Sequence, residues 1–283
     1  MGLTVRGLTA GELELVQPLT HRAFGDLDTR HGRPVRTVGA AEDRWNREVD
    51  RHLLATGRCL GAFDGDQLVS VAESSVRGHL WQLALLVVEP GRHGQGVGRA
   101  LLEASLDGAP QVRTFASSRD SQAMRLYARA GFRLLPALWA RGVVEVERLG
   151  DATGCREADV AADAERVGLA HLAGDLAFLQ QRGTRVLVSE RGCAIADGRG
   201  VDGWARVLSA GSPREGQRLL RAGLAAVAAP GRTVMAGQLT PQQDWAVEVA
   251  LEARMELAPC GPVAVSGVDD PLSGTCPVPA VLV

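Results

Sequence analysis

The sequence predicts a protein of the α/β (α+β) class, built from two similar domains that each carry a mixed, mostly antiparallel sheet flanked by helices. Two observations support this fold class. The first half of the chain reads as one strand, two helices, three strands, a helix, a strand, a helix and two strands, an order typical of helices packed on a largely antiparallel sheet. A similar order recurs in the second half with little residue identity, which indicates a structural repeat.

Hydrophobic periodicity and turn residues define the elements of the first half. Helices are expected at 11–24, 40–54, 97–105 and 120–129, with a loop or broken helix at 25–39. Strands are expected at 3–5, 58–63, 67–75, 79–88, 112–116, 132–135 and 143–146. The second and third of these strands flank Asp64-Gly65-Asp66, which is a good hairpin turn.

The second half repeats this plan after a linker near residues 149–154, so we predict domains at 1–148 and 149–283. The length agrees, because 283 residues exceed the roughly 150 residues of an average domain. Helices are expected at 156–181 (in one or two pieces), 213–228 and 241–257. Strands are expected at 185–189, 193–197, 203–208, 233–236 and 263–267.

Composition excludes several classes of function. All 31 basic residues are Arg, so there is no Lys for a Walker loop or a Schiff base. A net charge of −2 leaves no basic footprint for nucleic acid, and the 5 scattered cysteines have no metal-ligand spacing. The longest apolar run is too short to span a membrane and no signal peptide is apparent. We therefore expect a cytoplasmic protein, monomer or homodimer, without a metal, a membrane or a nucleic acid as partner.

A glycine-rich turn joins the apolar strand 79–88 to the helix that begins near Val97. The alternating glycines are Gly94, Gly96 and Gly98. Glycines let the backbone approach a bulky anion, and the unpaired N–H groups of a first helical turn bind such an anion. Arg92 or Arg99 could add a bidentate contact with a phosphate. The spacing argues against a dinucleotide-binding GxGxxG loop, while a glycine turn without a ligand stays open as an alternative.

The predicted helix 120–129 carries Tyr127, which is the only tyrosine of the chain. Ala123, Leu126 and Tyr127 share one face at helical spacing. The Tyr127 hydroxyl could donate a hydrogen bond to a thioester sulfur or a proton to a leaving thiolate. Taken alone, a packing role at the edge of the core explains this residue at least as well.

Together these two segments resemble the GCN5-related N-acetyltransferase (GNAT) superfamily. The long strand, the loop of the form Arg/Gln-x-x-Gly-x-Gly/Ala and the helix Asn-x-x-Ala-x-x-x-Tyr-x-x-x-Gly-Phe match in order and spacing within residues 83–132, and the resemblance covers 3–148. It implies an acyltransferase that uses acetyl-CoA. Two positions depart from the pattern: His93 stands where Arg or Gln is usual, with Arg92 one place early, and Asp120 replaces Asn.

The resemblance also implies roles for single residues. Pantetheine would lie along the end of the strand, the pyrophosphate would lie on the loop amides, and Tyr127 would be the general acid to the CoA thiolate. The cofactor-binding residues implied in this way are Leu86, Val87, Val88, Arg92, His93, Gly94, Gln95, Gly96, Val97, Gly98, Arg99, Asp120, Ala123 and Tyr127.

No residue of the sequence stands out as the base that takes a proton from the attacking amine. Glu73, in the third strand, is the first candidate, and His79 and Glu89 follow. A solvated or ion-paired role is the alternative for each of them. The carboxylate of Val283 is a further candidate, because the apolar tail 277–283 could lie near the first site, as in some tandem members of the family.

The second half lacks the signals for cofactor binding. Residues 209–216 stand at the place of the loop without alternating glycines, and Glu215 would repel a pyrophosphate there. Ala250 falls where Tyr127 stands in the first half. This half resembles the degenerate domains of tandem family members such as mycothiol synthase and the Eis-type aminoglycoside acetyltransferases, which implies that it walls the acceptor pocket and stabilises the first domain.

The expected reaction is transfer of acetyl from acetyl-CoA to a primary amine of a small molecule by direct attack. We prefer a cationic acceptor, an aminoglycoside or a basic peptide antibiotic, which would make the protein an antibiotic-resistance enzyme. The reasons are the tandem architecture, an acidic second half and the presence of Asp26 and Asp28 after the first helix. The alternatives are a protein N-terminus or lysine as acceptor, and a non-catalytic acetyl-CoA-sensing or interaction module.

Overall fold

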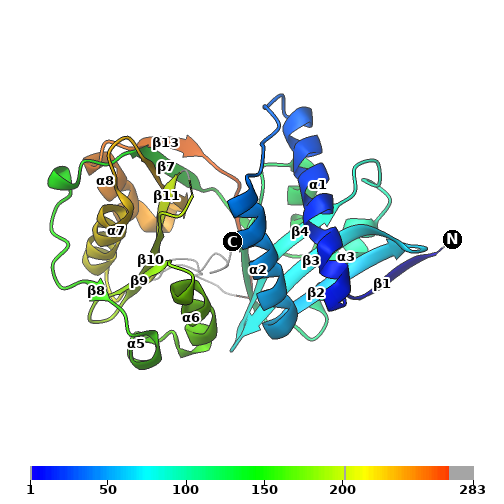
Figure 1. Ribbon diagram of the computed structural model, residues 1–283, viewed down its shortest axis with the longest axis horizontal. Coiled ribbons are helices and arrows are strands. Elements are labelled where there is room, and N and C mark those ends of the chain that lie inside the picture. The colour runs from blue at the N-terminus through cyan, green and yellow to red at the C-terminus, as the bar shows by residue number, and fades with distance from the viewer. Residues whose placement is uncertain (1, 201, 268–283) are drawn as a thin grey trace. The chain divides into compact units, whose positions relative to one another are not determined.

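The computed structural model describes residues 2–200 and 202–267, which fold into helices and two mixed sheets (Figure 1). The chain divides into two compact units. The first comprises Met1–Arg113 and Asp120–Phe132, and the second comprises Thr114–Arg119 and Arg133–Val283. The division that we predicted at residues 148/149 stays a prediction. None of the helices in the described residues is both long and apolar enough to cross a membrane.

The first unit contains a strand, two long helices, a meander of three strands and two further helices. In chain order these are β1 (Leu3–Gly7), the 3-10 helix η1 (Ala10–Leu15), α1 (Val16–Arg30), α2 (Ala40–Thr56), β2 (Arg58–Asp64), β3 (Gln67–Arg77), β4 (Leu80–Val88), α3 (Val97–Leu106) and α4 (Ser121–Arg129). Strand β5 (Val112–Ala116) begins in the first unit and ends in the second.

The second unit has a similar alternation of strands and helices. Its elements are β6 (Arg133–Leu135), β7 (Leu138–Val143), η2 (Val146–Arg148), β8 (Arg156–Glu157), α5 (Val160–Arg166), η3 (Ala170–Leu172), α6 (Ala173–Gln181), β9 (Arg185–Val188), β10 (Cys193–Asp197), β11 (Gly203–Ser209), α7 (Pro213–Val227), β12 (Thr233–Leu239), η4 (Pro241–Gln243), α8 (Asp244–Glu252), β13 (Glu256–Pro259) and β14 (Val263–Ser266).

The strands in the described part of the chain form two seven-stranded sheets. Their orders are β1-β2-β3-β4-β5-β14-β6 and β13-β7-β12-β11-β10-β9-β8. Both are mostly antiparallel, and β11 and β12 form a parallel pair. The predicted mixed, mostly antiparallel architecture is therefore confirmed.

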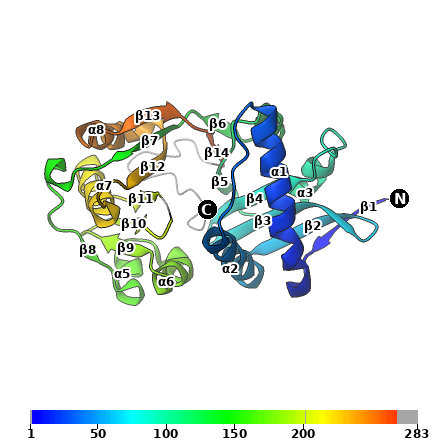
Figure 2. The ribbon, with the colours of Figure 1, turned by 45° about the horizontal axis from the view of Figure 1, so that its top comes forward.

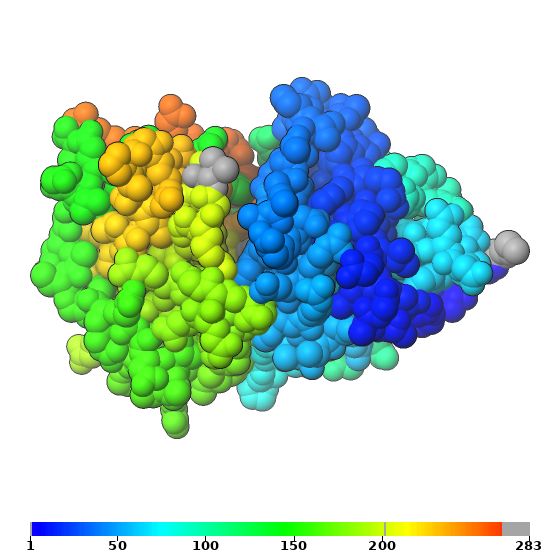
Figure 3. All heavy atoms as spheres, viewed as in Figure 1, coloured from blue at the N-terminus to red at the C-terminus, as the bar shows by residue number. Residues whose placement is uncertain are grey.

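The sheet of the first unit carries helices on both faces. Ala72 of β3 packs with Val97 and Leu101 of α3. Successive residues of a strand point to opposite faces, so Glu73 points away from α3. That other face carries α1 and α2 (Figure 2), whose atoms, in blue, form much of the visible surface of this unit in the space-filling view (Figure 3).

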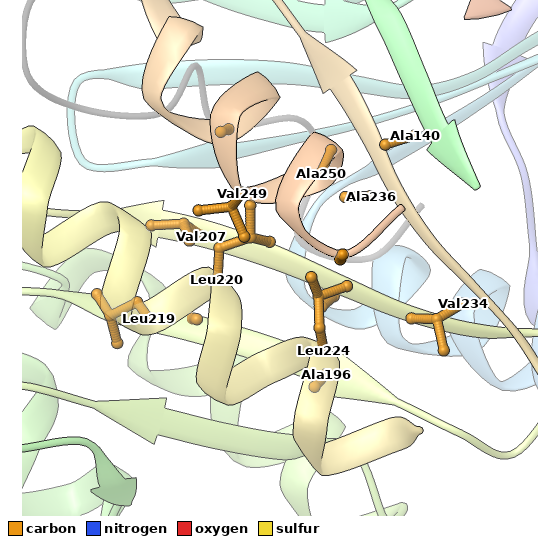
Figure 4. Close-up of a cluster of buried hydrophobic side chains, with 14 of the residues drawn as sticks. Ala140, Ala196, Val207, Leu219, Leu220, Leu224, Val234, Ala236, Val249 and Ala250 are labelled. Atoms are coloured by element: carbon orange, nitrogen blue, oxygen red, sulfur yellow. The ribbon is translucent and has the colours of Figure 1, made fainter. Parts of the chain in front are cut away.

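The core of the second unit lies between α7, α8 and the second sheet (Figure 4). Leu219, Leu220 and Leu224 of α7 pack there against strand and helix residues such as Val207 and Val249. Burial of side chains of this size stabilises a fold by about 2 kcal/mol each. Ala140 of β7 belongs to the same core, with no exposed surface.

Three predicted helices differ in their bounds. Helix α1 continues through Gly25 to Arg30, although we expected a loop or a broken helix after residue 24. The segment 156–181 contains the short strand β8 and two helices rather than helix alone. Helix α8 ends at Glu252, because Arg254 adopts a φ of +56° and turns the chain into β13, whose first two residues we had assigned to the helix.

Two predicted strands differ from the structure: the first in its position and its sheet, and the second in its sheet. We expected a strand at 143–146, but β7 ends at Val143, and it pairs with β12 and β13 of the second sheet. The alternation of buried Ala140 with exposed Trp139 explains this position. Strand β14, expected to close the second domain, pairs with β6 and belongs to the first sheet.

Candidate active site

The turn between β4 and α3 combines left-handed glycines with an uncapped helix N-terminus. Gly91, Gly94 and Gly96 have φ values of +83°, +78° and +81°. Helix α3 begins at Val97 without a side-chain cap, so the N–H groups of its first turn lack the acceptor that a cap would supply. A Cβ added at any of these glycines would meet no atom within 4 Å. The turn is therefore open enough to hold an anion such as a pyrophosphate.

Gly98 sets the distance between α3 and the end of β4. A Cβ at this position would lie 3.2 Å from Val88 Cγ2 and 3.7 Å from Leu126 Cδ2 of α4. The missing side chain lets the start of α3 lie close to both elements. This contact fixes the position of the N–H groups relative to the strand end.

The two arginines near the turn are ion-paired with acidic residues. Arg92 donates to Asp64 at 2.7 Å, and Arg99 donates to Glu103 at 2.7 Å, one turn further along α3. Beside them, His93 is half-buried and Gln95 is exposed, with its Nε2 donating to the Gly91 carbonyl at 3.1 Å. An anion at this turn would therefore meet backbone N–H groups rather than an unpaired Arg92 or Arg99.

Asp120 precedes the first residue of helix α4, and Tyr127 lies about two turns further along the helix. Asp120 is the N-cap of the helix: its Oδ1 accepts from the Gln122 N–H at 2.8 Å, and its Oδ2 pairs with Arg30 at 3.0 Å. Burial alone would raise the pKa of Asp120, but these hydrogen bonds outweigh it and hold the pKa below its usual range. Tyr127 is 6% exposed, and burial followed by the charge of Asp120 raises its pKa, so the hydroxyl keeps its proton. Ala123, one turn before Tyr127, is half-buried.

Strand β4 contains a bulge next to the first candidate base. Glu73 lies opposite Leu85 and Ser74 lies opposite Leu83, so Ala84 has no partner on β3. A bulge leaves the backbone groups of the extra residue outside the regular ladder. Glu73 therefore lies beside the one irregular point of the β3–β4 pairing.

The residues predicted to meet pantetheine lie between this bulge and the glycine turn. Leu86 and Val88 pack on the α3 side of the sheet, and Val87 is buried on the other. The Ser70 hydroxyl donates to the Val87 carbonyl at 2.6 Å, so this carbonyl is already hydrogen-bonded. Contact of these three residues with a ligand stays a prediction.

Glu73 belongs to a cluster of buried polar side chains between the sheet and its helices. It is 2% exposed, and Asp50 of α2, 3% exposed, is hydrogen-bonded to it. Gln17 Nε2 of α1 donates to Asp50 at 2.8 and 3.1 Å, and the Cys59 thiol of β2 donates to Glu73 Oε1 at 3.6 Å. Burial, followed by the charge of Asp50, raises the pKa of Glu73 to about 8. Burial also raises the pKa of Asp50 to about 6.

The sequence did not lead us to Asp50, Gln17 or Cys59. One signal was present: Asp50 stands in the apolar stripe of α2 between Val49 and Leu53, both of which are buried. A carboxylate in such a stripe needs a partner, because burying an unpaired charge is costly.

The other candidate bases are placed less favourably. Hydrogen bonds from Arg22, at 2.6 and 2.8 Å, hold the pKa of Glu89 below its usual range, so this carboxylate is a weak proton acceptor. His79 is exposed in the turn just before β4, at the opposite end of the strand from the glycine turn. Val283 and the tail 277–283 lie outside the described residues.

Comparison with known families identifies the domain that holds this site. Residues 55–134 match the family model of the acetyltransferase (GNAT) domain, a range that includes the bulge, the glycine turn and α4. The chain carries a GNAT acetyltransferase domain. This finding supports an acyltransferase. A search of curated protein sequences finds no match.

Solved structures with the GNAT fold align over nearly the whole chain. A candidate acetyltransferase from Pyrococcus horikoshii has a TM-score of 0.73 at 16% identity and covers 100% of this chain and 96% of its own. A GCN5-related N-acetyltransferase from Kribbella flavida has a TM-score of 0.59 at 20% identity, covering 93% and 71%. A tandem GNAT protein of the clavulanic acid pathway has a TM-score of 0.56 at 14% identity, covering 95% and 100%. At these identities the likeness establishes the fold, a tandem arrangement included.

The second unit, unlike the GNAT domain, fills its corresponding turn with its own carboxylate. Glu215, 5% exposed at the start of α7, accepts from the Gly211 N–H at 2.9 Å, the Arg191 N–H at 2.8 Å and the Ser189 hydroxyl at 2.5 Å. The hydrogen bonds outweigh burial and lower the pKa of Glu215. This carboxylate satisfies amides that would otherwise be available to an external anion. Ala250, which the sequence comparison of the two halves aligns with Tyr127, has no exposed surface.

We expect Glu215→Ala to lower the free energy of unfolding by about 3 kcal/mol, since it leaves buried donors without an acceptor. The measurement is urea unfolding followed by tryptophan fluorescence, to which Trp245 contributes with a ring that packs against Gly216 of α7. Glu190→Ala, an exposed change in the β9–β10 turn, is the control and should leave the stability near that of the wild type. Equal stability of both variants would show that the carboxylate is not a structural part of the turn.

Proposed function

We propose that the GNAT domain binds acetyl-CoA at the β4–α3 turn and transfers its acetyl group to a primary amine by direct attack. The observation that supports this most is the open glycine turn, where uncapped N–H groups at the start of α3 suit a pyrophosphate. The proposed ligand residues are those predicted from the sequence, namely Leu86–Val88, Arg92–Arg99, Asp120, Ala123 and Tyr127. Acetyl-CoA is a co-substrate here, and no His, Cys, Asp and Glu cluster suited to a metal occurs among the described residues.

In the proposed reaction the amine nitrogen bonds to the thioester carbonyl carbon and the carbon–sulfur bond breaks. Glu73 takes one proton from the attacking ammonium group, since burial raises its pKa to about 8 and so makes its ionised form a stronger base than an ordinary carboxylate. Tyr127, whose raised pKa keeps the hydroxyl protonated, gives a proton to the CoA thiolate and regains one as the second amine proton leaves. The products are the acetamide, CoA and one proton.

For the acceptor we propose a small cationic amine, an aminoglycoside or a basic peptide antibiotic, and hence a cytoplasmic role in antibiotic resistance. The second half, with its excess of acidic over basic residues, supports this choice. Asp26 and Asp28 add less than we expected, because each pairs with an arginine, Arg30 and Arg33 respectively.

A thiol-release assay tests the proposal. The purified full chain would be given acetyl-CoA with a panel of aminoglycosides, basic peptides, polyamines, amino acids and peptides with free N-termini or lysines. We expect turnover on one cationic small-molecule class. Turnover only on peptides would replace the acceptor with a protein, and acetyl-CoA binding without any turnover would favour a non-catalytic sensing module.

We expect Gly96→Val to weaken acetyl-CoA binding at least about tenfold, because a β-branched residue is strained at a φ of +81° and would crowd the N–H groups. Isothermal titration calorimetry measures the affinity. Gly65→Val is a matched control, since Gly65 has a φ of +60° and equally open surroundings but lies in the β2–β3 hairpin. An equal loss in both variants would attribute the effect to strain and contradict an anion site at the turn.

A further inference from the structure

The buried cluster around Glu73 holds two carboxyl groups on adjoining elements. Asp50 comes from α2 and Glu73 from β3, and both are almost without exposed surface. Two carboxylates cannot both be ionised at hydrogen-bond distance in a buried site, so their mutual hydrogen bond requires a proton on one of them. The pair therefore carries one shared proton over the neutral range.

The remaining groups around the pair keep it in one geometry. From α1, Gln17 donates to both oxygens of Asp50, and from β2 the Cys59 thiol donates to Glu73. The charges that act on Asp50 from α2 are Arg47 and Arg51, which favour its ionised form. These surroundings bias the shared proton toward Glu73 and leave Asp50 as the more acidic partner.

This arrangement is a poor choice for stability alone. Replacing a buried ionic pair by apolar residues of similar size is often neutral or stabilising, whereas here four elements supply polar side chains to one buried point. Strongly raised carboxyl pKa values with a specific partner are typical of sites that handle protons. Glu73 of β3 also lies opposite the bulge of β4, and β4 is the strand that leads to the glycine turn.

We propose that Asp50 is a positioning residue, which holds one proton jointly with Glu73 so that the pair acts as a single proton acceptor for the attacking amine. This inference rests on the proposed function. The pair with one proton accepts a second from the ammonium group, with one proton then on each carboxyl, and returns to its resting state by releasing one to solvent. Asp50 does not touch the acceptor or the thioester: it sets the proton affinity and orientation of Glu73.

The first test detects the proton that Asp50 and Glu73 share, and it needs no acceptor amine. The Cys59 thiol reports on Glu73, because its S–H group donates to that carboxylate. We would follow the S–H stretching band of the full chain by infrared spectroscopy between pH 5 and 9, and assign it with Cys59→Ala. In the wild type we expect the band to shift as Glu73 ionises near pH 8. In Asp50→Asn, where an amide replaces the like charge, we expect this shift at least one pH unit lower. An unchanged midpoint would overturn the shared proton.

The second test measures the role of the Asp50–Glu73 pair in acetyl transfer. The substrate is an amine that the panel identifies, or water, as acetyl-CoA hydrolysis, if no amine is turned over. We expect Asp50→Asn to lower kcat about tenfold and to leave acetyl-CoA affinity unchanged. In the wild type the acidic limb of the kcat–pH profile should lie near pH 6, where the pair takes up its second proton, whereas in Asp50→Asn it should coincide with the infrared midpoint of Glu73. Asp50→Glu should recover part of the rate, since it restores a carboxyl group.

Glu42→Gln is the matched control on the same helix, where the carboxylate pairs with Arg36 at 2.5 Å, and it should change neither profile. Loss of acetyl-CoA binding in Asp50→Asn would indicate a purely structural role and overturn the proposal. An infrared shift without a change in the kinetic profile would also overturn it. Failure of the wild type to bind acetyl-CoA would instead contradict the proposed function.

Discussion

Replacing Tyr127 with Phe is expected to lower kcat for acetyl transfer about 10²- to 10³-fold while acetyl-CoA affinity stays near the wild-type value. Only the hydroxyl is removed, and the ring, 6% exposed, keeps its packing in α4. Because burial raises the pKa of Tyr127, the hydroxyl is protonated at every pH at which the protein would be assayed and is available as a donor. Without it the thiolate must leave unprotonated.

The measurement for Tyr127 separates binding from chemistry. Single-turnover kinetics give the transfer rate, and calorimetry gives the affinity for acetyl-CoA. Met124→Leu, a volume-conserving change of a half-buried residue in the same helix, is the control for packing and should retain the wild-type rate. A transfer rate of Tyr127→Phe equal to that of the wild type would leave Tyr127 a packing residue only.

Glu73→Gln is expected to remove a pH dependence of stability amounting to about 3 kcal/mol in the wild type. The pKa of Glu73 is raised from 4.5 to about 8, so the folded protein binds this proton more tightly than the unfolded chain does. Stability is therefore highest below pH 4.5 with respect to this group and falls as the pH rises toward 8. A neutral amide cannot ionise, so the variant should lose less stability than the wild type between pH 5 and pH 8.

Protection of β3 amides in hydrogen exchange, at pH 5 and pH 8 after correction for intrinsic rates, measures this effect in the first unit alone. Glu89→Gln is a control of opposite sign, because the pKa of Glu89 is lowered by Arg22, and its contribution is lost as the pH falls. If the wild type and Glu73→Gln show the same pH dependence, the Glu73 carboxyl is not protonated in the folded protein.

The site could be predicted from the sequence where its residues are close in the chain. The alternating glycines lie next to the start of α3, and Asp120 and Tyr127 lie about two turns apart along α4, so local spacing was enough to find these candidates. The Asp50–Glu73 pair was not predictable, because it depends on the packing of α2 against β3. Glu73 was our first candidate base, but its partner and its burial came only from the structure.

The fold, too, could be predicted where the signal is local and could not be predicted where it depends on pairing between distant segments. Strand alternation identified β2, β3 and β4 almost to the residue, since each is defined by its own pattern. Alternation does not say which neighbour a strand will choose, so the partners of β7 and β14 were missed. Gly25 lies inside α1 because tertiary packing overrides the low helix propensity of a single glycine.

The partners of β7 and β14 have a consequence for anyone who dissects this protein. A cut at the predicted linker would separate β7 from β12 and β13, and β14 from β6. Each fragment would then expose unpaired strand edges, which favour aggregation. Neither half is an independent module, so a truncation that abolishes activity would say nothing about which half holds the chemistry, whereas two fragments expressed together could reassemble by exchanging these strands.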